Sequence, residues 1–329
     1  MSASREGRAP SELSLPQERM IDLAARVAKL TAERLDGLPE EAAWKGASRA
    51  ELAPTIAGPP PETGRTPEES VDRVIRDVRP YAARVDHPRV FAFVPSSATW
   101  PGVLADFLGA GYYVFQGTWL GSSGPSPLEL TVFVWCGQWL GSGEGARGLF
   151  TSGGSAASLD ALVAAREAAG APARPTVYMS ALSHPALVRA ARLIGVRPEH
   201  VRMIPSRDDF RLDVEVLRQA IRDDTDAGLH PIAVCANAGT TNTGSVDPID
   251  ELADVAAEAE TWLHVDGAYG GFGVLPDRGR AAFGGLSRAD SIAMVAHKWL
   301  YQPFEAGCLV VRDVGSLDRA FSVRPDYLQ

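Results

Sequence analysis

The second half of the chain alternates between short apolar runs and longer stretches with helical hydrophobic spacing. Strands that are apolar along their whole length are typical of a mainly parallel sheet with helices on both faces. The runs expected to be strands are 176–180, 201–205, 231–237, 261–266, 292–295 and 308–311. The sequence therefore predicts an α/β fold built on one such sheet.

The N-terminal part of the chain has a different pattern. Residues 16–36 carry apolar side chains at helical spacing, residues 58–67 are rich in proline and glycine, and residues 68–85 again favour helix. We expect a helical arm and linker at 1–88, followed by one large α/β domain at 89–329.

Composition excludes several classes of partner. A net charge of −9, without a stripe of lysine and arginine, argues against nucleic-acid binding. Cys136, Cys235 and Cys308 are far apart in the sequence, which argues for a reducing compartment without a disulfide framework. The sequence shows neither a signal peptide nor an apolar segment long enough to span a membrane. We expect a cytoplasmic protein.

Polar residues follow the expected strands, and in parallel sheets function lies at the carboxyl ends of the strands. These residues are His184, Thr240, Thr241, Asp266 and Lys298. Lysine is among the residues least often buried, so its position directly after a core strand needs a reason. Either Lys298 reaches from a turn to water, or its amine is held inside a site for chemistry.

A glycine pair opens the helix expected within residues 148–170. Gly153 and Gly154 would let a ligand approach the backbone, free N–H groups at a helix start attract phosphate, and Ser155 adds a hydroxyl. The same residues could be only a cap and turn. The upstream run "GEGARG" (143–148) fits a dinucleotide motif, but no clear strand precedes it and no helix follows directly.

Two other strand-end residues also have ordinary explanations when taken alone. Asp266 could be a helix cap, and His184 could face solvent at a helix start. His264 and His297 complete no metal-ligand spacing, so a zinc site is not expected.

Taken together, the strand-end residues and the glycine pair suggest a cofactor. A phosphate-binding helix start, a carboxylate, a histidine and a buried lysine are the groups that hold pyridoxal phosphate. Lys298 would form the Schiff base, and Asp266 would keep the pyridine nitrogen protonated.

With these motifs the chain resembles the pyridoxal-phosphate-dependent group II amino-acid decarboxylases, the aromatic-L-amino-acid decarboxylase family. The resemblance runs from about residue 16 to the end. It rests on "PPPETG", "HPRVFAFVPSSATWPGVLAD", "TSGGSAASLDAL", "SHPALVRAARLIG", "NAGTTNTGSVDPI", "HVDGAYGG" and "HKWL", which occur in the family's order. It implies a fold-type I large domain.

The resemblance assigns a role to each matching residue. Lys298 corresponds to the Schiff-base lysine, Asp266 to the partner of the pyridine nitrogen, and His184 to the histidine that stacks on the ring. The remaining cofactor-binding positions are Gly153, Gly154 and Ser155 for the phosphate, with Thr241, Ala268 and His297. Asp247 matches the acidic residue of a "DP" turn, where we expect a structural role.

The chain also departs from the family. Many members have an asparagine that helps to bind phosphate at the position of Val295. Relatives continue into a small C-terminal domain, which we expect to be absent here. Tyr327 aligns with a tyrosine of the mobile catalytic loop that protonates Cα. Because Tyr327 stands near the end of this chain, we expect the chain to bind cofactor but to decarboxylate poorly.

The resulting hypothesis is decarboxylation of an L-amino acid, preferably aromatic, to the amine and CO2. The alternatives are another reaction on the same cofactor, such as aldehyde synthesis or transamination, or a non-catalytic dimerisation partner. The resemblance implies a homodimer with shared active sites, in which the arm wraps the other subunit. The aromatic residues of "FAFVPSSATW" and "GYYVFQGTW" would suit an aromatic substrate, although such residues belong more often to a core.

Overall fold

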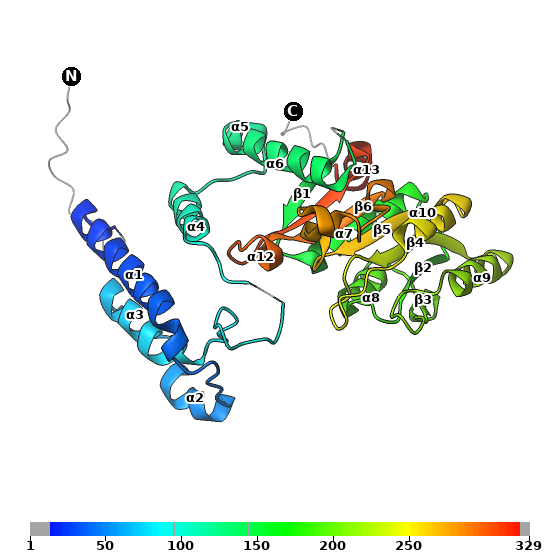
Figure 1. Ribbon diagram of the computed structural model, residues 1–329. Coiled ribbons are helices and arrows are strands. Elements are labelled where there is room, and N and C mark those ends of the chain that lie inside the picture. The colour runs from blue at the N-terminus through cyan, green and yellow to red at the C-terminus, as the bar shows by residue number, and fades with distance from the viewer. Residues whose placement is uncertain (1–13, 95, 144, 323–329) are drawn as a thin grey trace, which may run out of the picture. The chain divides into compact units, whose positions relative to one another are not determined.

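The computed structural model describes residues 14–94, 96–143 and 145–322 of the chain (Figure 1). Tyr327 lies outside the described residues. Two compact units divide between Phe93 and Val94. The domain boundary at residue 88 that the sequence suggests stays a prediction.

The first unit is helical. Its helices are α1 (Gln17–Gly37), α2 (Arg49–Ile56) and α3 (Pro67–Arg73), and short helical turns follow α3 at Val74–Val78 and Arg79–Tyr81. Ion pairs join α1 to α3, with Arg19 to Glu68 at 2.5 Å and Arg26 to Asp72. Among the described residues of this unit, Leu38 is the only fully buried apolar side chain. The arm therefore has almost no core of its own.

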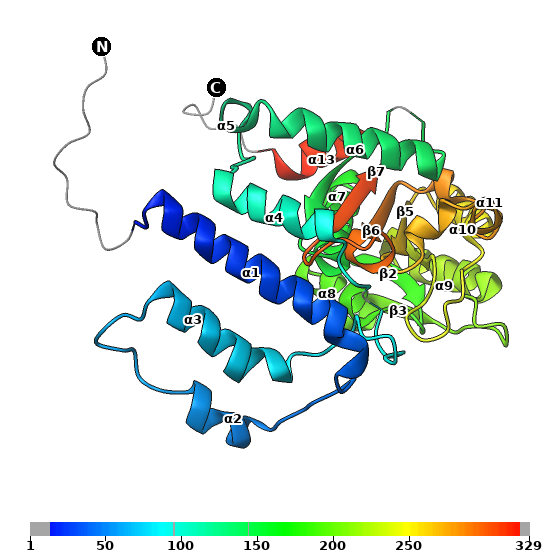
Figure 2. The same ribbon diagram turned by 60° about the vertical axis from the view of Figure 1, so that its left-hand side comes forward.

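The second unit is an α/β domain around one sheet of seven strands (Figures 1 and 2). The strands are β1 (Arg147–Thr151), β2 (Pro175–Ser180), β3 (Val201–Ile204), β4 (His230–Asn237), β5 (Trp262–Gly267), β6 (Ser291–Val295) and β7 (Gly307–Val311). Their order across the sheet is β1-β7-β6-β5-β4-β2-β3. Neighbouring strands from β6 to β3 are parallel, and β7 runs antiparallel to both β1 and β6. The predicted mainly parallel sheet is confirmed.

Helices cover both faces of this sheet (Figures 1 and 2). The helices of the unit are α4 (Trp100–Tyr112), α5 (Trp119–Ser122), α6 (Pro125–Leu140), α7 (Gly154–Ala168), α8 (Pro185–Leu193), α9 (Val214–Asp226), α10 (Ile249–Glu258), α11 (Asp277–Arg280), α12 (Ala296–Trp299) and α13 (Val314–Phe321). α6, α9 and α10 share one core cluster with the sheet, whereas α7, α8 and α13 form the clusters on the other side. Along β5, Leu263 and Val265 belong to the first cluster, because alternate side chains of a strand point to opposite faces.

The helices that precede β1 differ from those expected from the sequence. Helices α4, α5 and α6 were not expected, and the helical region after the proline-rich connector ends at Tyr81 rather than near residue 85. For the aromatic residues of "GYYVFQGTW", the sequence left a core role and a substrate-binding role open, and in this chain they are not core residues: Tyr113 is 91% exposed and Trp119 is 62% exposed. The sequence pattern could not show this, because burial depends on what these helices pack against.

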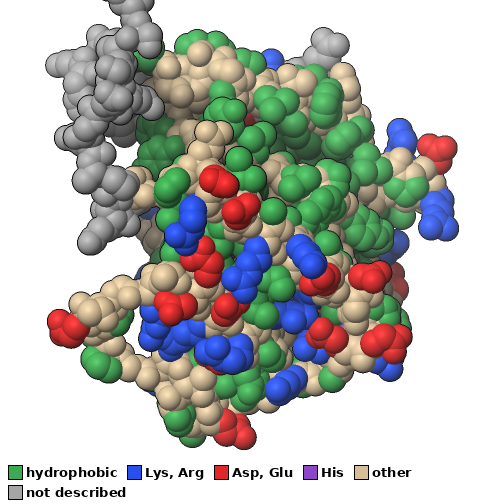
Figure 3. Space-filling model, turned by 90° about the vertical axis from the view of Figure 1, so that its left-hand side faces the viewer, with side chains coloured by type: hydrophobic (Ala, Val, Ile, Leu, Met, Phe, Trp, Pro, Cys, Tyr) green, Lys and Arg blue, Asp and Glu red, His purple; other side chains and the backbone are tan. Residues whose placement is uncertain are grey.

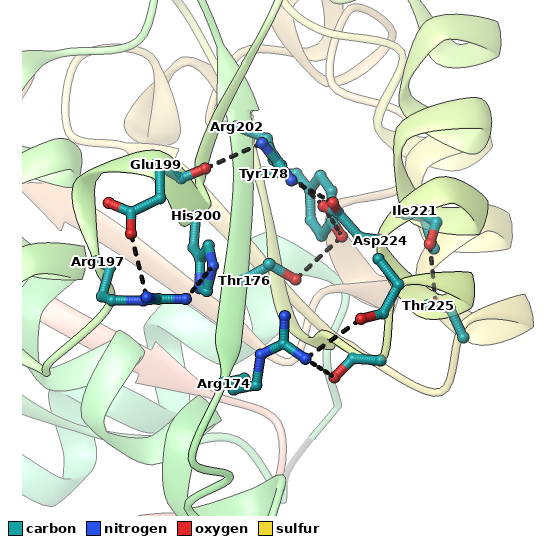
Figure 4. Close-up of polar contacts among 12 residues, drawn as sticks. Arg174, Thr176, Tyr178, Arg197, Glu199, His200, Arg202, Ile221, Asp224 and Thr225 are labelled. Carbon is teal, nitrogen blue, oxygen red and sulfur yellow. Dashed lines mark hydrogen bonds and ion pairs between the residues drawn. The ribbon is translucent and has the colours of Figure 1, made fainter.

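A polar cluster lies between β2, β3 and α9, near the amino ends of the strands (Figure 4). The Tyr178 hydroxyl donates to Asp224 Oδ2 at 2.8 Å and is within 3.0 Å of Thr176 Oγ1. Arg202 donates Nε to the same carboxylate at 2.9 Å and also contacts its other oxygen. Burial alone would raise the pKa of Asp224, but the hydrogen bonds from Arg202 and Tyr178 hold that pKa below its ordinary value.

Replacement of Asp224 tests the contribution of this cluster to stability. We expect Asp224→Asn to lower the free energy of unfolding by about 2 kcal/mol near neutral pH, because hydrogen bonds to a charged group contribute this much. A lowered folded-state pKa stabilises the fold above the unfolded-state value of about 3.9, and this stabilisation disappears as the pH falls through the folded-state pKa. The difference between the two proteins in urea unfolding should therefore shrink in acid.

The neighbouring exposed residue Asp223 supplies the control. Its side chain accepts only from Gln219 on the helix surface, at 2.7 Å. Asp223→Asn should change the unfolding midpoint little at any pH. An equal effect of both substitutions would show that the cluster has no special role.

Candidate active site

One pocket of about 380 Å³ lies at the carboxyl ends of the parallel strands. It is lined by Ser152, Gly153, Gly154, Ser155, Ala156, His184, Ala186, Asn237, Gly239, Thr240, Thr241, Asp266, Ala268, Tyr269, Val295, His297, Lys298, Phe304 and Glu305. Every site residue suggested by the sequence is among them except Tyr327, which is outside the described residues. The strand-end rule therefore located the pocket correctly.

The backbone at the start of α7 forms one wall of the pocket. The Thr151 hydroxyl donates to the Gly153 carbonyl at 2.9 Å and accepts from the Gly153 N–H at 3.3 Å, which fixes the turn. A Cβ on Gly154 would lie 2.8 Å from the Cβ of Ala268, and one on Gly307 would lie 2.4 Å from the Gly153 backbone. Glycine is required by this close packing. Among the described side chains none caps the α7 start, which leaves N–H groups of the first turn without a side-chain partner, as in helix starts that bind anions.

Asp266 and Lys298 are positioned by the neighbouring strands β5 and β6. Asp266 is the penultimate residue of β5, and its Oδ1 accepts from the Ala268 N–H at 3.1 Å. Lys298 lies in α12, directly after β6. Burial lowers the pKa of Lys298, and the charge of Asp266 opposes this only in part. A larger share of neutral amine makes Lys298 a better nucleophile than an exposed lysine.

Two histidines, His184 and His297, line the pocket. His184 caps α8, where its Nδ1 accepts from the Ala186 N–H at 3.2 Å. His297 Nδ1 accepts from the Ala306 N–H at 3.1 Å. In each ring this leaves Nε2 for other contacts. Burial and the charge of Lys298 lower the pKa of His297, so His297 favours the neutral form.

Sequence reasoning missed several lining residues. Asn237 ends β4 opposite Asp266, and the strand-end rule could have found it. Its side chain donates to Asp247 Oδ2 at 2.8 Å and to Ser183 Oγ at 3.1 Å. Asp247 is buried and also accepts from the Leu212 N–H, which agrees with the structural role expected for it. Phe304 and Glu305 carried no sequence signal, because they lie in the loop before β7.

Val295 and Thr241 line the pocket in different ways. A Cβ on Gly154 would lie 3.3 Å from Val295 Cγ2, so the valine is an apolar neighbour of the α7 start. Thr241 is exposed at the edge of the pocket, whereas the hydroxyl of its buried neighbour Thr240 is 2.6 Å from Thr243 Oγ1. Ser152, Ser155, Thr240 and Thr241 are the lining serine and threonine residues, and each carries a hydroxyl group.

The site combines a half-buried lysine, a carboxylate and a glycine-lined helix start at one edge of an α/β sheet, and this combination defines a class of proteins. A model of the pyridoxal-dependent decarboxylase conserved domain matches residues 59–329. The chain belongs to this family. It is 35% identical over 319 residues to the aromatic-L-amino-acid decarboxylase of Bacillus atrophaeus, covering 96% of this chain and 66% of that protein.

Other relatives agree on the family. A phenylacetaldehyde synthase of Petunia hybrida is 33% identical, over 82% of this chain and 57% of that protein. The crystal structure of Oryza sativa TDC with PLP and tryptamine has a TM-score of 0.91 at 29% identity, over 97% of this chain and 69% of that one. The chain thus spans about two thirds or less of the length of the curated relatives named here.

The pocket fits pyridoxal phosphate, the cofactor of this family. Its volume suits a small cofactor. The uncapped α7 start with Ser155 would hold the phosphate, Asp266 would face the ring nitrogen, and Lys298 would reach the aldehyde.

Among the described residues, no group of histidine, cysteine and acidic side chains could hold a metal ion. No helix in the described part of the chain is both long and apolar enough to cross a membrane.

The lowered pKa of Lys298 predicts a measurable reactivity. With excess amine-reactive reagent, labelling of Lys298 should reach its half-maximum at lower pH than labelling of Lys29, because burial disfavours the charged amine. Lys29, Lys45 and Lys298 are the only lysines in the sequence, so peptide mapping can follow each separately. Identical pH profiles for Lys298 and Lys29 would contradict this interpretation.

Proposed function

We propose that the protein decarboxylates an L-amino acid, preferably aromatic, to the amine and CO2, with the cofactor held as a Schiff base on Lys298. The observation that carries the proposal is the placement of Lys298, Asp266 and the α7 start around one pocket in a member of the decarboxylase family. Several curated relatives are named as decarboxylases of aromatic amino acids.

Each residue has a defined task in this proposal. When bound, pyridoxal phosphate withdraws the electron pair that CO2 leaves at the substrate Cα. Asp266 holds the ring nitrogen protonated, since a nearby carboxylate favours the charged form of the ring. His184 would orient the ring from one face, and Ala268 would pack near the other. His297 and Thr241 complete the cofactor-binding set, and Tyr327 is proposed to return the proton to Cα.

Aldehyde formation is the alternative reaction for the same cofactor and fold. Relatives include phenylacetaldehyde synthases, which motivates aldehyde formation as the alternative. Product analysis with and without oxygen separates the two, because aldehyde formation from the amino acid consumes an oxidant and decarboxylation does not. A protein that binds cofactor but turns over no amino acid would instead support the non-catalytic alternative.

Release of CO2 tests the proposed function directly. The protein loaded with pyridoxal phosphate should release CO2 from an aromatic amino acid slowly, in line with the poor decarboxylation expected from the sequence, and Lys298→Ala should abolish this release. Borohydride reduction of the loaded protein should leave the pyridoxyl group on the peptide that contains Lys298. A label on Lys29 or Lys45 would remove Lys298 from the proposed role.

Replacement of Asp266 tests the carboxylate separately. We expect Asp266→Asn to bind cofactor with the fold intact and to lower turnover about 100-fold or more, because the ring nitrogen loses its charged partner. The control is Asp208→Asn, an exposed loop residue outside the pocket. Activity of Asp266→Asn within a few-fold of the parent protein would contradict the proposal.

We also propose a homodimer with shared active sites, in which the N-terminal arm wraps the partner. The exposed apolar surface of the segment 104–130 supports the proposed dimer, because large exposed apolar patches mark association surfaces. Its exposed side chains are Leu104, Phe107, Leu108, Tyr112, Tyr113, Val114, Phe115, Trp119, Leu120, Leu128 and Leu130. Figure 3 shows hydrophobic side chains gathered on one part of this surface. The cytoplasmic location stays a prediction.

Sedimentation tests the dimer. The protein should sediment as a dimer at micromolar concentration, and Leu120→Lys should shift it toward monomer, because a charge is costly in a buried interface. Leu193→Lys is the control, since Leu193 is also exposed, at 66%, but lies on α8. A stable monomer for the parent protein would refute the proposal.

A further inference from the structure

The loop before β7 brings a carboxylate to the pocket. The Ala296 N–H donates to the Ala306 carbonyl at 2.8 Å, and the Ala306 N–H donates to His297 Nδ1 at 3.1 Å. On the other side, the ring of Phe304 lies against the ring of His297, with centroids 4.6 Å apart. Glu305 stands between these two anchored neighbours and lines the pocket. Its backbone is therefore held in place at the rim.

The charge of Glu305 acts inside the pocket. Among the described residues, none forms a hydrogen bond or an ion pair with the side chain of Glu305. The carboxylate nevertheless favours the charged form of His297, against the larger opposing effects of burial and of Lys298 on the pKa of that histidine. A negative field from Glu305 thus reaches the residue next to Lys298.

The other charged groups that line the pocket already have roles in the proposed function. Asp266 and Lys298 belong to the cofactor in the proposed function, and His297 favours its neutral form. Among the described lining residues there is no arginine. A substrate with a second carboxylate would find no free cation on these residues, and it would meet the charge of Glu305. Phe304 and Tyr269 provide aromatic surface for an uncharged side chain.

We propose that Glu305 determines the substrate class of this pocket: it disfavours amino acids with anionic side chains and leaves the pocket to neutral and aromatic ones. This inference rests on the proposed function for the position of the cofactor. Specificity of this kind needs a repulsive element against the wrong substrate as well as contacts to the right one. Because Glu305 is exposed, solvent screens its charge, and we expect discrimination of about tenfold rather than exclusion.

The test is a comparison of binding constants for L-glutamate and L-phenylalanine. Both are measured from the change that the amino acid causes in the absorbance band of the cofactor-loaded protein, which does not depend on turnover. Glu305→Gln keeps the size of the side chain and removes its charge. We expect it to tighten binding of L-glutamate relative to L-phenylalanine about tenfold, and to do so less at high salt. Glu305→Asp should keep the discrimination of the parent protein.

Glu251→Gln is the matched control, because Glu251 is an exposed carboxylate on α10 outside the pocket. An unchanged ratio of the two binding constants in Glu305→Gln would overturn the inference, as would an equal shift in Glu251→Gln. The outcome is independent of catalysis. A shifted ratio in a protein that releases no CO2 would support the role of Glu305 and refute the proposed decarboxylase activity, whereas normal CO2 release with an unchanged ratio would refute only the role of Glu305.

Discussion

The parallel pairing of β4, β5 and β6 holds Lys298 half-buried next to Asp266. Asn237 lies opposite Asp266 across β4 and β5, and Gly267 lies opposite Met294 across β5 and β6. Because side chains alternate along a strand, a slip of one residue in either pair would turn the carboxylate to the other face of the sheet. The register is in turn secured by buried apolar residues on both faces, so the chemistry of the pocket depends on the packing of the whole sheet.

The strands and the pocket were accessible from sequence, because both follow from local pattern. Continuous apolar runs mark buried strands, and residues directly after parallel strands must gather at one edge. His184, Asp266 and Lys298 were found in this way, and Asn237 could have been. The exposed aromatic residues near Tyr113 were not predictable by the same reasoning. The sequence left open whether these residues belong to a core or to a substrate site, and only the structure shows that their side chains are exposed in a single chain.

Residues in connecting loops were the hardest to predict. Glu305 has no strand-end position, no motif and no periodicity, and its relation to the pocket depends on the contacts of Phe304 and Ala306 with His297. Asp247 shows the opposite case. It is a buried carboxylate in a motif, where a catalytic role would be tempting, but the backbone N–H groups of Leu212 and Asn237 both donate to it. Burial raises the pKa of Asp247 and these bonds oppose that effect, as expected for a carboxylate that fixes a turn.

The pocket contains two carboxylates, those of Asp266 and Glu305, which are held in different ways. Asp266 lies at the end of β5, partly buried, and is the carboxylate proposed to face a cationic ring. Glu305 lies at the exposed rim, where screening is strong and the same charge has a weaker effect on whatever enters. The position of Asp266 is set by the fold, because the register of β5 with β4 and β6 cannot change without loss of the sheet. The rim carboxylate is held only by a loop, so its charge can differ between proteins that share this sheet, and the preference for one class of amino acid can change while the reaction stays the same.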